Sequence, residues 1–122
     1  MNIFEPSIQN SFFHPPLIFP QAEDGIIDLG KVETFVIGKI NYVGKAAGQM
    51  IYIPVLWFSG LYPKEIYQPG WFYQSKSADE EEINIHRYNF ERLSETGVAV
   101  IYYYLKDETK LSQPIIIRTI KT

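Results

Sequence analysis

Apolar side chains alternate with polar ones, or run continuously for a few residues, through most of the chain after residue 25. Short segments with this period of two, bounded by glycine, proline or charged turns, are typical of β-strands. Seven such segments are predicted, at residues 26–29, 32–43, 49–58, 71–76, 83–88, 98–105 and 113–121. A helical turn at 89–94 is expected after the fifth segment.

The turns between these segments predict which strands pair. Residues 44–48 begin and end with glycine, so we expect a hairpin joining 32–43 to 49–58. The charged turn 106–110 predicts a second hairpin, between 98–105 and 113–121. Segment 49–58 is apolar on both of its faces and contains Pro54, which cannot donate to a β-ladder. An edge position, a bulge or a break is therefore expected at Pro54.

Residues 1–24 do not follow either period. They hold half of the prolines and half of the phenylalanines of the chain. Proline fixes φ and pushes the preceding residue into an extended conformation, so this segment should be an extended arm. It is too apolar for an ordinary disordered tail. Its exposed aromatic side chains require a cover, which is either the arm's own domain or a neighbouring subunit.

The composition supports the same fold class. The chain has 17 Ile and 6 Val against 7 Leu and 5 Ala, and β-branched residues favour strands. We therefore predict a mainly antiparallel all-β fold, either a small β-sandwich or a partly open β-barrel of about seven strands with at most one short helix. The predicted domains are an arm at 1–24 and a single β-domain at 25–122. Ser77 to Glu80 also match a helix capping box.

Charge and cysteine content exclude several classes of protein. The chain of 122 residues has a net charge of −3 and no cysteine, which excludes disulfide scaffolds, thiolate zinc sites and cysteine nucleophiles. Residues 1–30 carry −4 with no Lys or Arg, and the remainder carries +1. This balance argues against nucleic acid as a partner. No apolar run approaches a membrane span of about 20 residues, and no signal peptide is recognisable. We expect synthesis in the cytoplasm, followed by incorporation into a particle under the assembly hypothesis below.

No motif for catalysis, a cofactor or a metal stands out. Gly44 and Lys45 lack the spacing and the hydroxyl residue of a phosphate-binding loop. His14 and His86 have no second histidine nearby, so no metal site is predicted. The four acids at 79–82 lack the alternation of a calcium loop. We therefore expect a non-enzyme that has no cofactor.

The aromatic side chains allow two interpretations. Trp57, Trp71, Phe72, Tyr73 and the tyrosines at 102–104 could stack on sugar rings, or they could be core and cross-strand pairs. Strand alternation places neighbouring tyrosines on opposite faces, so about half of these rings should face outward and be available to a partner.

The leading hypothesis is a non-enzymatic structural or assembly subunit of a homo- or hetero-oligomer, of the kind found in a virus or phage particle as a capsid-decorating, connector or tail protein. Its predicted interaction residues are Phe12, Phe13, Pro15, Pro16, Ile18, Phe19, Trp57, Trp71 and Tyr103. Docking of the arm in cis and docking in trans are both open. The alternatives are a small carbohydrate-binding module and an acidic inhibitor or immunity-type protein that uses Glu80 to Glu82.

Overall fold

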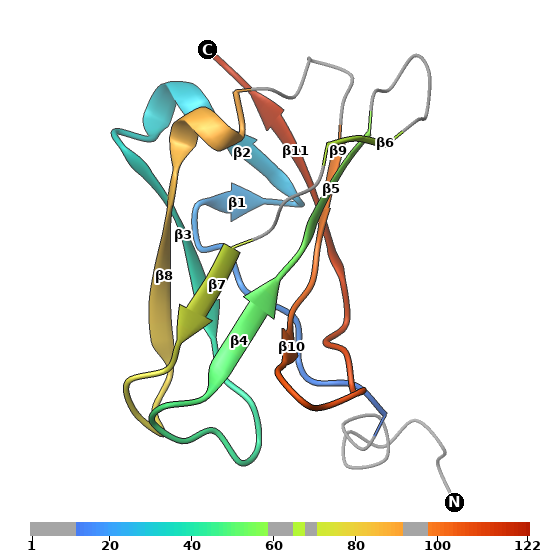
Figure 1. The fold of residues 1–122 in the computed structure, drawn as a ribbon. Helices are drawn as coiled ribbons and strands as arrows, with labels where there is room; N and C mark the ends of the chain where they lie inside the picture. The colour runs from blue at the N-terminus through green and yellow to red at the C-terminus, as the bar shows by residue number, and fades with distance from the viewer. Residues whose placement is uncertain (1–11, 59–64, 68–70, 92–97) are drawn as a thin grey trace, which may run out of the picture.

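The regular structure of the described residues is almost entirely β-strand (Figure 1). The computed structural model describes residues 12–58, 65–67, 71–91 and 98–122, without the side chains of Trp57, Tyr88 and residues 65–67. Strands make up 48% of the described part and no helix in it reaches seven residues, so the predicted all-β class is confirmed.

The described residues form eleven short strands and two single-turn 3-10 helices. They are β1 (Ala22–Glu23), β2 (Ile26–Asp28), η1 (Leu29–Lys31), β3 (Phe35–Ile40), β4 (Met50–Ile53), β5 (Val55–Phe58), β6 (Glu65–Tyr67), β7 (Trp71–Gln74), β8 (Glu81–His86), η2 (Arg87–Asn89), β9 (Val98–Ile101), β10 (Tyr104–Leu105) and β11 (Ile115–Ile120). The number exceeds seven for two reasons: the chain breaks within two predicted strands, and β1 and β6 lie outside the predicted strand segments. Pro54 separates β4 from β5 as expected, and residues 102–103 separate β9 from β10.

The strands form three sheets that face one another as in a sandwich. The largest has the order β1-β2-β11-β9-β5-β6, and the others are β10-β4-β7 and β3-β8. In Figure 1, β3 and β8 lie side by side at the left, whereas β5, β9 and β11 lie together at the right. All pairs are antiparallel except β2 with β11, which is parallel. The predicted pairing of 98–105 with 113–121 is confirmed for β9 and β11.

The predicted hairpin between 32–43 and 49–58 is wrong. β3 pairs with β8, and β4 pairs with β7 and β10. The connection at 41–49 is held by its own side chains, because the hydroxyl of Tyr42 donates to Gln49 Oε1 and Lys45 extends to Glu81. These contacts carry the chain from one sheet to another instead of turning it back along β3.

The turn chemistry after β7 also differs from the expectation. Ser77 does not cap a helix, because its hydroxyl accepts from the backbone N–H of Asp79 at 3.1 Å and the chain then enters β8 directly. A helical turn follows β8 at Arg87–Asn89, earlier than the predicted 89–94, whose residues 92–94 lie outside the described part.

One hydrophobic core lies between the sheets. Its fully buried members include Val36, Ile53, Phe90, Ile101 and Tyr103. Leu17 and Phe19 belong to the same cluster, although both come from the predicted arm. The described part of residues 1–24 is therefore packed against its own domain.

Candidate interaction surface

The N-terminal segment, residues 12–20, spans from one sheet to the other. At its start the N–H of His14 donates to Leu111 O at 3.0 Å, and Gln113 N donates to His14 O at 2.9 Å. Farther along, Ile18 and Lys39 of β3 exchange two backbone hydrogen bonds of 3.0 and 2.7 Å. The prolines between these anchors remove donors that would otherwise need partners. Both ends of the segment are thus fixed.

The inner side of this segment fits the core. Leu17 and Phe19 are 1% and 4% exposed. A Cβ atom at Gly38 would lie 3.3 Å from Cε1 of Phe19, so the glycine leaves room for the ring. The hydroxyl of Tyr103 donates to the carbonyl of Pro15. These contacts explain why the segment lies in cis.

His14 is buried where the segment meets the tyrosines. Its ring lies 5.1 Å from Tyr42 and 5.9 Å from Tyr103, stacked on the latter, and its Nε2 lies 3.3 Å from Glu108 Oε1. Burial lowers the pKa of His14, and Lys110 adds to this, while Glu108 acts in the opposite direction. Burial also raises the pKa of Tyr42 to about 12 and raises that of Tyr103. The rings therefore stay neutral at neutral pH.

The outer side of the segment is apolar and exposed. Phe12, Phe13 and Ile18 are 67%, 45% and 56% exposed, and Val43 is 84% exposed. Ile18 and Val43 line the same open hollow of about 350 Å³, together with Pro15, Pro16, Lys39, Asn41, Tyr42 and Glu80. Exposed apolar groups gathered in this way mark interaction sites more often than single exposed residues do. We call Phe12, Phe13, Ile18 and Val43 the outer arm surface.

A second apolar surface covers the outward face of the central strands. Its members are half-buried or exposed and come from outward positions of β4, β5, β7, β9, β10 and β11 and the residues between them: Met50, Tyr52, Pro54, Leu56, Phe58, Phe72, Val98, Val100, Tyr102, Tyr104 and Ile116. We call this set the outer row. The sequence indicates this surface, because segment 49–58 is apolar on both of its faces. Most residues of the outer row were nevertheless not among the predicted interaction residues.

The rings of the outer row stack on each other. Tyr104, Tyr52 and Phe72 are cross-strand neighbours on β10, β4 and β7. Tyr52 lies 5.4 Å from Tyr104 with an interplanar angle of 21°, and 6.4 Å from Phe72 at 38°. Both separations lie within the range of aromatic contact. The three rings therefore pack against each other on the outward face.

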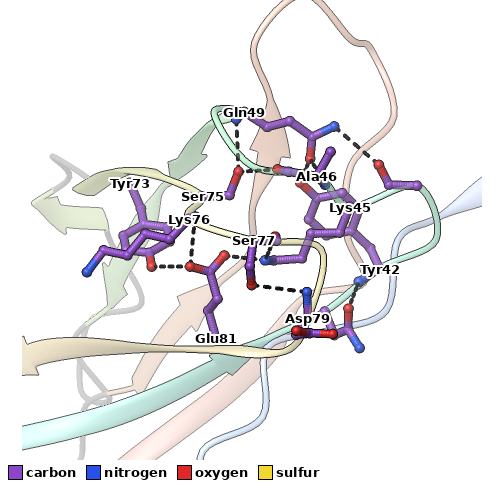
Figure 2. A network of polar contacts seen from close by, with 12 residues as sticks. Tyr42, Lys45, Ala46, Gln49, Tyr73, Ser75, Lys76, Ser77, Asp79 and Glu81 are labelled. Carbon is purple, nitrogen blue, oxygen red and sulfur yellow. Dashed lines mark hydrogen bonds and ion pairs between the residues drawn. The ribbon is translucent and has the colours of Figure 1, made fainter.

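A buried polar network joins the loop 41–49 to the loop 75–81 (Figure 2). The Lys45 side chain is fully buried and donates to Glu81 Oε2 and, at 2.6 Å, to Ser77 O. Glu81 Oε1 also accepts from the Tyr73 hydroxyl and from the N–H of Lys76, both at 2.8 Å. Every buried side-chain polar atom in the described part of the chain has a partner.

The charges of this network are tightly coupled. Burial alone would raise the pKa of Glu81, but hydrogen bonds from Lys45, Tyr73 and Lys76 lower it to about 2. Burial and the Glu81 carboxylate raise the pKa of Tyr73 to about 12. A network in which every buried polar atom has a partner fixes the two loops relative to each other.

The predicted interaction residues fall into three groups. Phe12, Phe13 and Ile18 are exposed, and Pro15 and Pro16 are half-buried beside them. Phe19 and Tyr103 are core residues, which corrects their assignment as accessible contacts, because the segment docks in cis and odd-numbered positions of 99–105 point inward. Trp71 is half-buried against the core, and the Trp57 side chain lies outside the described part.

The aromatic residues that could stack on sugar rings are likewise divided between the core and the surface. Trp71 and Tyr73 pack against the core, whereas Phe72 between them is 66% exposed. Strand alternation therefore gives the outer row only one ring from β7.

Comparisons of the chain with protein-family models, with curated proteins and with solved structures found no match. No helix in the described ranges is long and apolar enough to cross a membrane. Those same ranges hold no group of three His, Asp or Glu side chains arranged to bind a metal ion.

Proposed function

We propose that this protein is a non-enzymatic structural subunit that binds another protein through the outer arm surface. The observation that carries the proposal is the division of one short segment into two sides. Leu17 and Phe19 fix the inner side in the core, while Phe13 and Ile18 are held outward in water.

Burial of the outer arm surface by a partner would contribute favourable free energy at a low entropic cost. Burying a Phe or Ile side chain contributes roughly 1.5–3 kcal/mol. The segment is already held by backbone hydrogen bonds at His14 and Ile18. A partner would therefore gain the apolar contact without ordering a flexible chain, and this reduces the entropic cost of association.

A component of a virus or phage particle is the most specific form of this proposal. Capsid-decorating, connector and tail proteins combine a small β-domain with an extended arm, and this chain has both. The likeness concerns architecture alone, so it supports the class of role and not a particular partner.

The proposal is tested by a photo-cross-linker placed on the outer arm surface. Benzoylphenylalanine replaces Phe13 in the full chain, which is expressed in the cells that make it, and the matched control carries it at exposed Phe35 on β3. We expect a protein adduct of defined mass from position 13 and none from position 35. Absence of a protein adduct from position 13 would overturn the proposal.

A second candidate function is carbohydrate binding, which is favoured by the exposed ring of Phe72 beside the half-buried rings of Tyr52 and Tyr104. Sugar rings stack on exposed ring faces, but Tyr52 and Tyr104 are half-buried and already in contact with each other. The assembly role therefore agrees better with the geometry. Titration with soluble glycans, followed by NMR of the tyrosine side chains, distinguishes the two functions.

A further inference from the structure

One edge of β3 is covered by the N-terminal segment instead of by a neighbouring strand. Ile18 and Lys39 exchange two backbone hydrogen bonds, so the N–H and C=O of Lys39 point away from β8. The backbone groups of alternate residues in a strand face the same edge, and those of Phe35 and Ile37 therefore face it too. A row of such groups is a template on which another extended chain can pair.

The side chain of Gln21 occupies the part of this edge that lies beyond Ile18. Its Oε1 accepts from the N–H of Ile37 at 2.7 Å, and its Nε2 donates to the carbonyl of Phe35 at 3.1 Å. A carboxamide has the same donor and acceptor groups as a peptide, so it can replace the backbone of a neighbouring strand. Regular pairing beyond Ile18 would place Pro20 opposite Ile37, and Pro20 has no N–H to donate.

The core holds Gln21 in this position. Phe19 is 4% exposed, and its ring lies against Gly38 of β3. The N–H of Ala22 then donates to the carbonyl of Phe19 at 2.9 Å, which closes a turn around Gln21. The side-chain amide is thus fixed beside β3 before any other chain arrives.

The sequence of the covered strand favours pairing with a copy of itself. Residues 34–38 read Thr-Phe-Val-Ile-Gly and contain no charge and no proline. Apolar segments of this kind are prone to intermolecular pairing when they are exposed at an edge. Two antiparallel copies of β3 can pair Ile37 with Ile37 and Phe35 with Lys39, so that no like charges lie opposite each other. Such a pair is symmetric and requires only one kind of surface.

We propose that the Gln21 side chain, together with the backbone of Ile18, prevents β3 from pairing with β3 of a second copy. The two residues satisfy the carbonyl of Phe35, the N–H of Ile37 and both backbone groups of Lys39. Removal of the amide leaves the first two groups open to another strand. Gln21 is not part of the outer arm surface, so this inhibitory contact is separate from the proposed function.

The test removes the amide from the full-length protein. Gln21→Leu keeps the bulk of the side chain without its hydrogen bonds, and the control Gln113→Leu makes the same change at an exposed position before β11. Gln21→Asn, whose amide is one methylene shorter, is the second variant if Gln21→Leu does not fold. Circular dichroism verifies folding, hydrogen exchange is measured at Ile37, and sedimentation is measured over a range of concentration.

Two further variants identify the strand through which any association occurs. Phe35→Lys in the Gln21→Leu background adds a charge to β3, and a charged side chain on an edge strand opposes pairing. Ile116→Lys in the same background adds the same charge to β11. Phe35 and Ile116 are 44% and 59% exposed, so both changes are made at the surface.

We expect exchange at the Ile37 N–H to become about tenfold faster in Gln21→Leu, which corresponds to 1.4 kcal/mol. The mass of this variant should rise with concentration above that of the native chain, whereas Gln113→Leu should behave like the native chain. Phe35→Lys should reverse the association and Ile116→Lys should not. A folded Gln21→Leu with the native mass at every concentration would overturn the inference. So would association that persists with Phe35→Lys, or failure of both position-21 variants to fold.

Discussion

The two faces of the central strands have nearly the same hydrophobicity and very different surroundings. Ile53 and Ile101 on the inward face are 1% and 0% exposed, while Tyr52 and Val100 beside them remain half-exposed. The inward face is covered by the other sheets and by Leu17 and Phe19 of the N-terminal segment. A period of two thus predicts that strands exist, but an apolar face alone does not show what covers it.

The largest effect on the free energy of unfolding is expected in the N-terminal segment. One side of this segment is also buried and the other exposed. Phe19→Ala should lower the free energy of unfolding by about 3–5 kcal/mol, because the ring fills a site in the core beside Gly38. Phe13→Ala on the outer side should change it by only about 0.5 kcal/mol. Urea denaturation measures both, and equal losses would contradict the comparison.

The same contrast between covered and exposed positions applies to two Lys–Glu pairs. Lys45–Glu81 is buried, whereas Lys39–Glu80 is separated by 3.9 Å and more than a third exposed. Lys45→Met should lower the free energy of unfolding by about 3 kcal/mol, because Glu81 loses its buried partner. Lys39→Met should cost about 0.5 kcal/mol.

The pH dependence of stability gives a further prediction for the Lys45–Glu81 pair. The pKa of Glu81 is lowered to about 2 in the folded chain, so its contribution is complete above its ordinary pKa near 4.5. The contribution should then be lost as pH falls from 4.5 towards 2. Unfolding measured at several pH values should show a shallower slope across this window for Glu81→Gln than for the native chain, and an unchanged slope would contradict the assignment.

A smaller effect is expected from the hydroxyl of Tyr103. Tyr103→Phe keeps the packing but removes the hydrogen bond to Pro15, and it should cost about 1 kcal/mol. Tyr104→Phe is the control, because a half-exposed hydroxyl can bind water instead. Hydrogen exchange at Ile18, whose N–H is bonded to Lys39, should accelerate only in the first variant.

The smallest effect is a pH dependence from His14. The pKa of His14 is lowered by burial, so the unfolded chain binds the proton more tightly and stability falls as pH drops below about 6.5. Glu108 and Lys110 are the charged groups acting on it, with Tyr42 and Tyr103 packed around the ring. His14→Gln should remove this dependence in thermal unfolding, while the control His86→Gln, at an exposed position at the end of β8, should retain it.

The all-β class, the break at Pro54 and the pairing of β9 with β11 could be predicted from the sequence, because period, turn chemistry and proline act locally. The pairing of β3 with β8 could not. It joins segments that lie far apart in the chain, from Phe35 with His86 to Ile40 with Glu81. A hairpin loop and a crossing between sheets look alike when only residues 44–48 are considered.

The candidate surface was predictable only in part. The sequence alone does not show which of the three tyrosines at 102–104 point inward. The structure places Tyr103 in the core, where its hydroxyl donates to the carbonyl of Pro15. Phe13, Ile18 and Phe19 look equally apolar in the sequence. The space beside Gly38 places Phe19 inside and leaves the other two outside.

The central claim is that the outer arm surface binds another protein. The most direct test is photo-cross-linking from position 13 of the full chain, with position 35 as the control. We expect a protein adduct of defined mass from position 13 and none from position 35. Absence of a protein adduct from position 13 would contradict the claim.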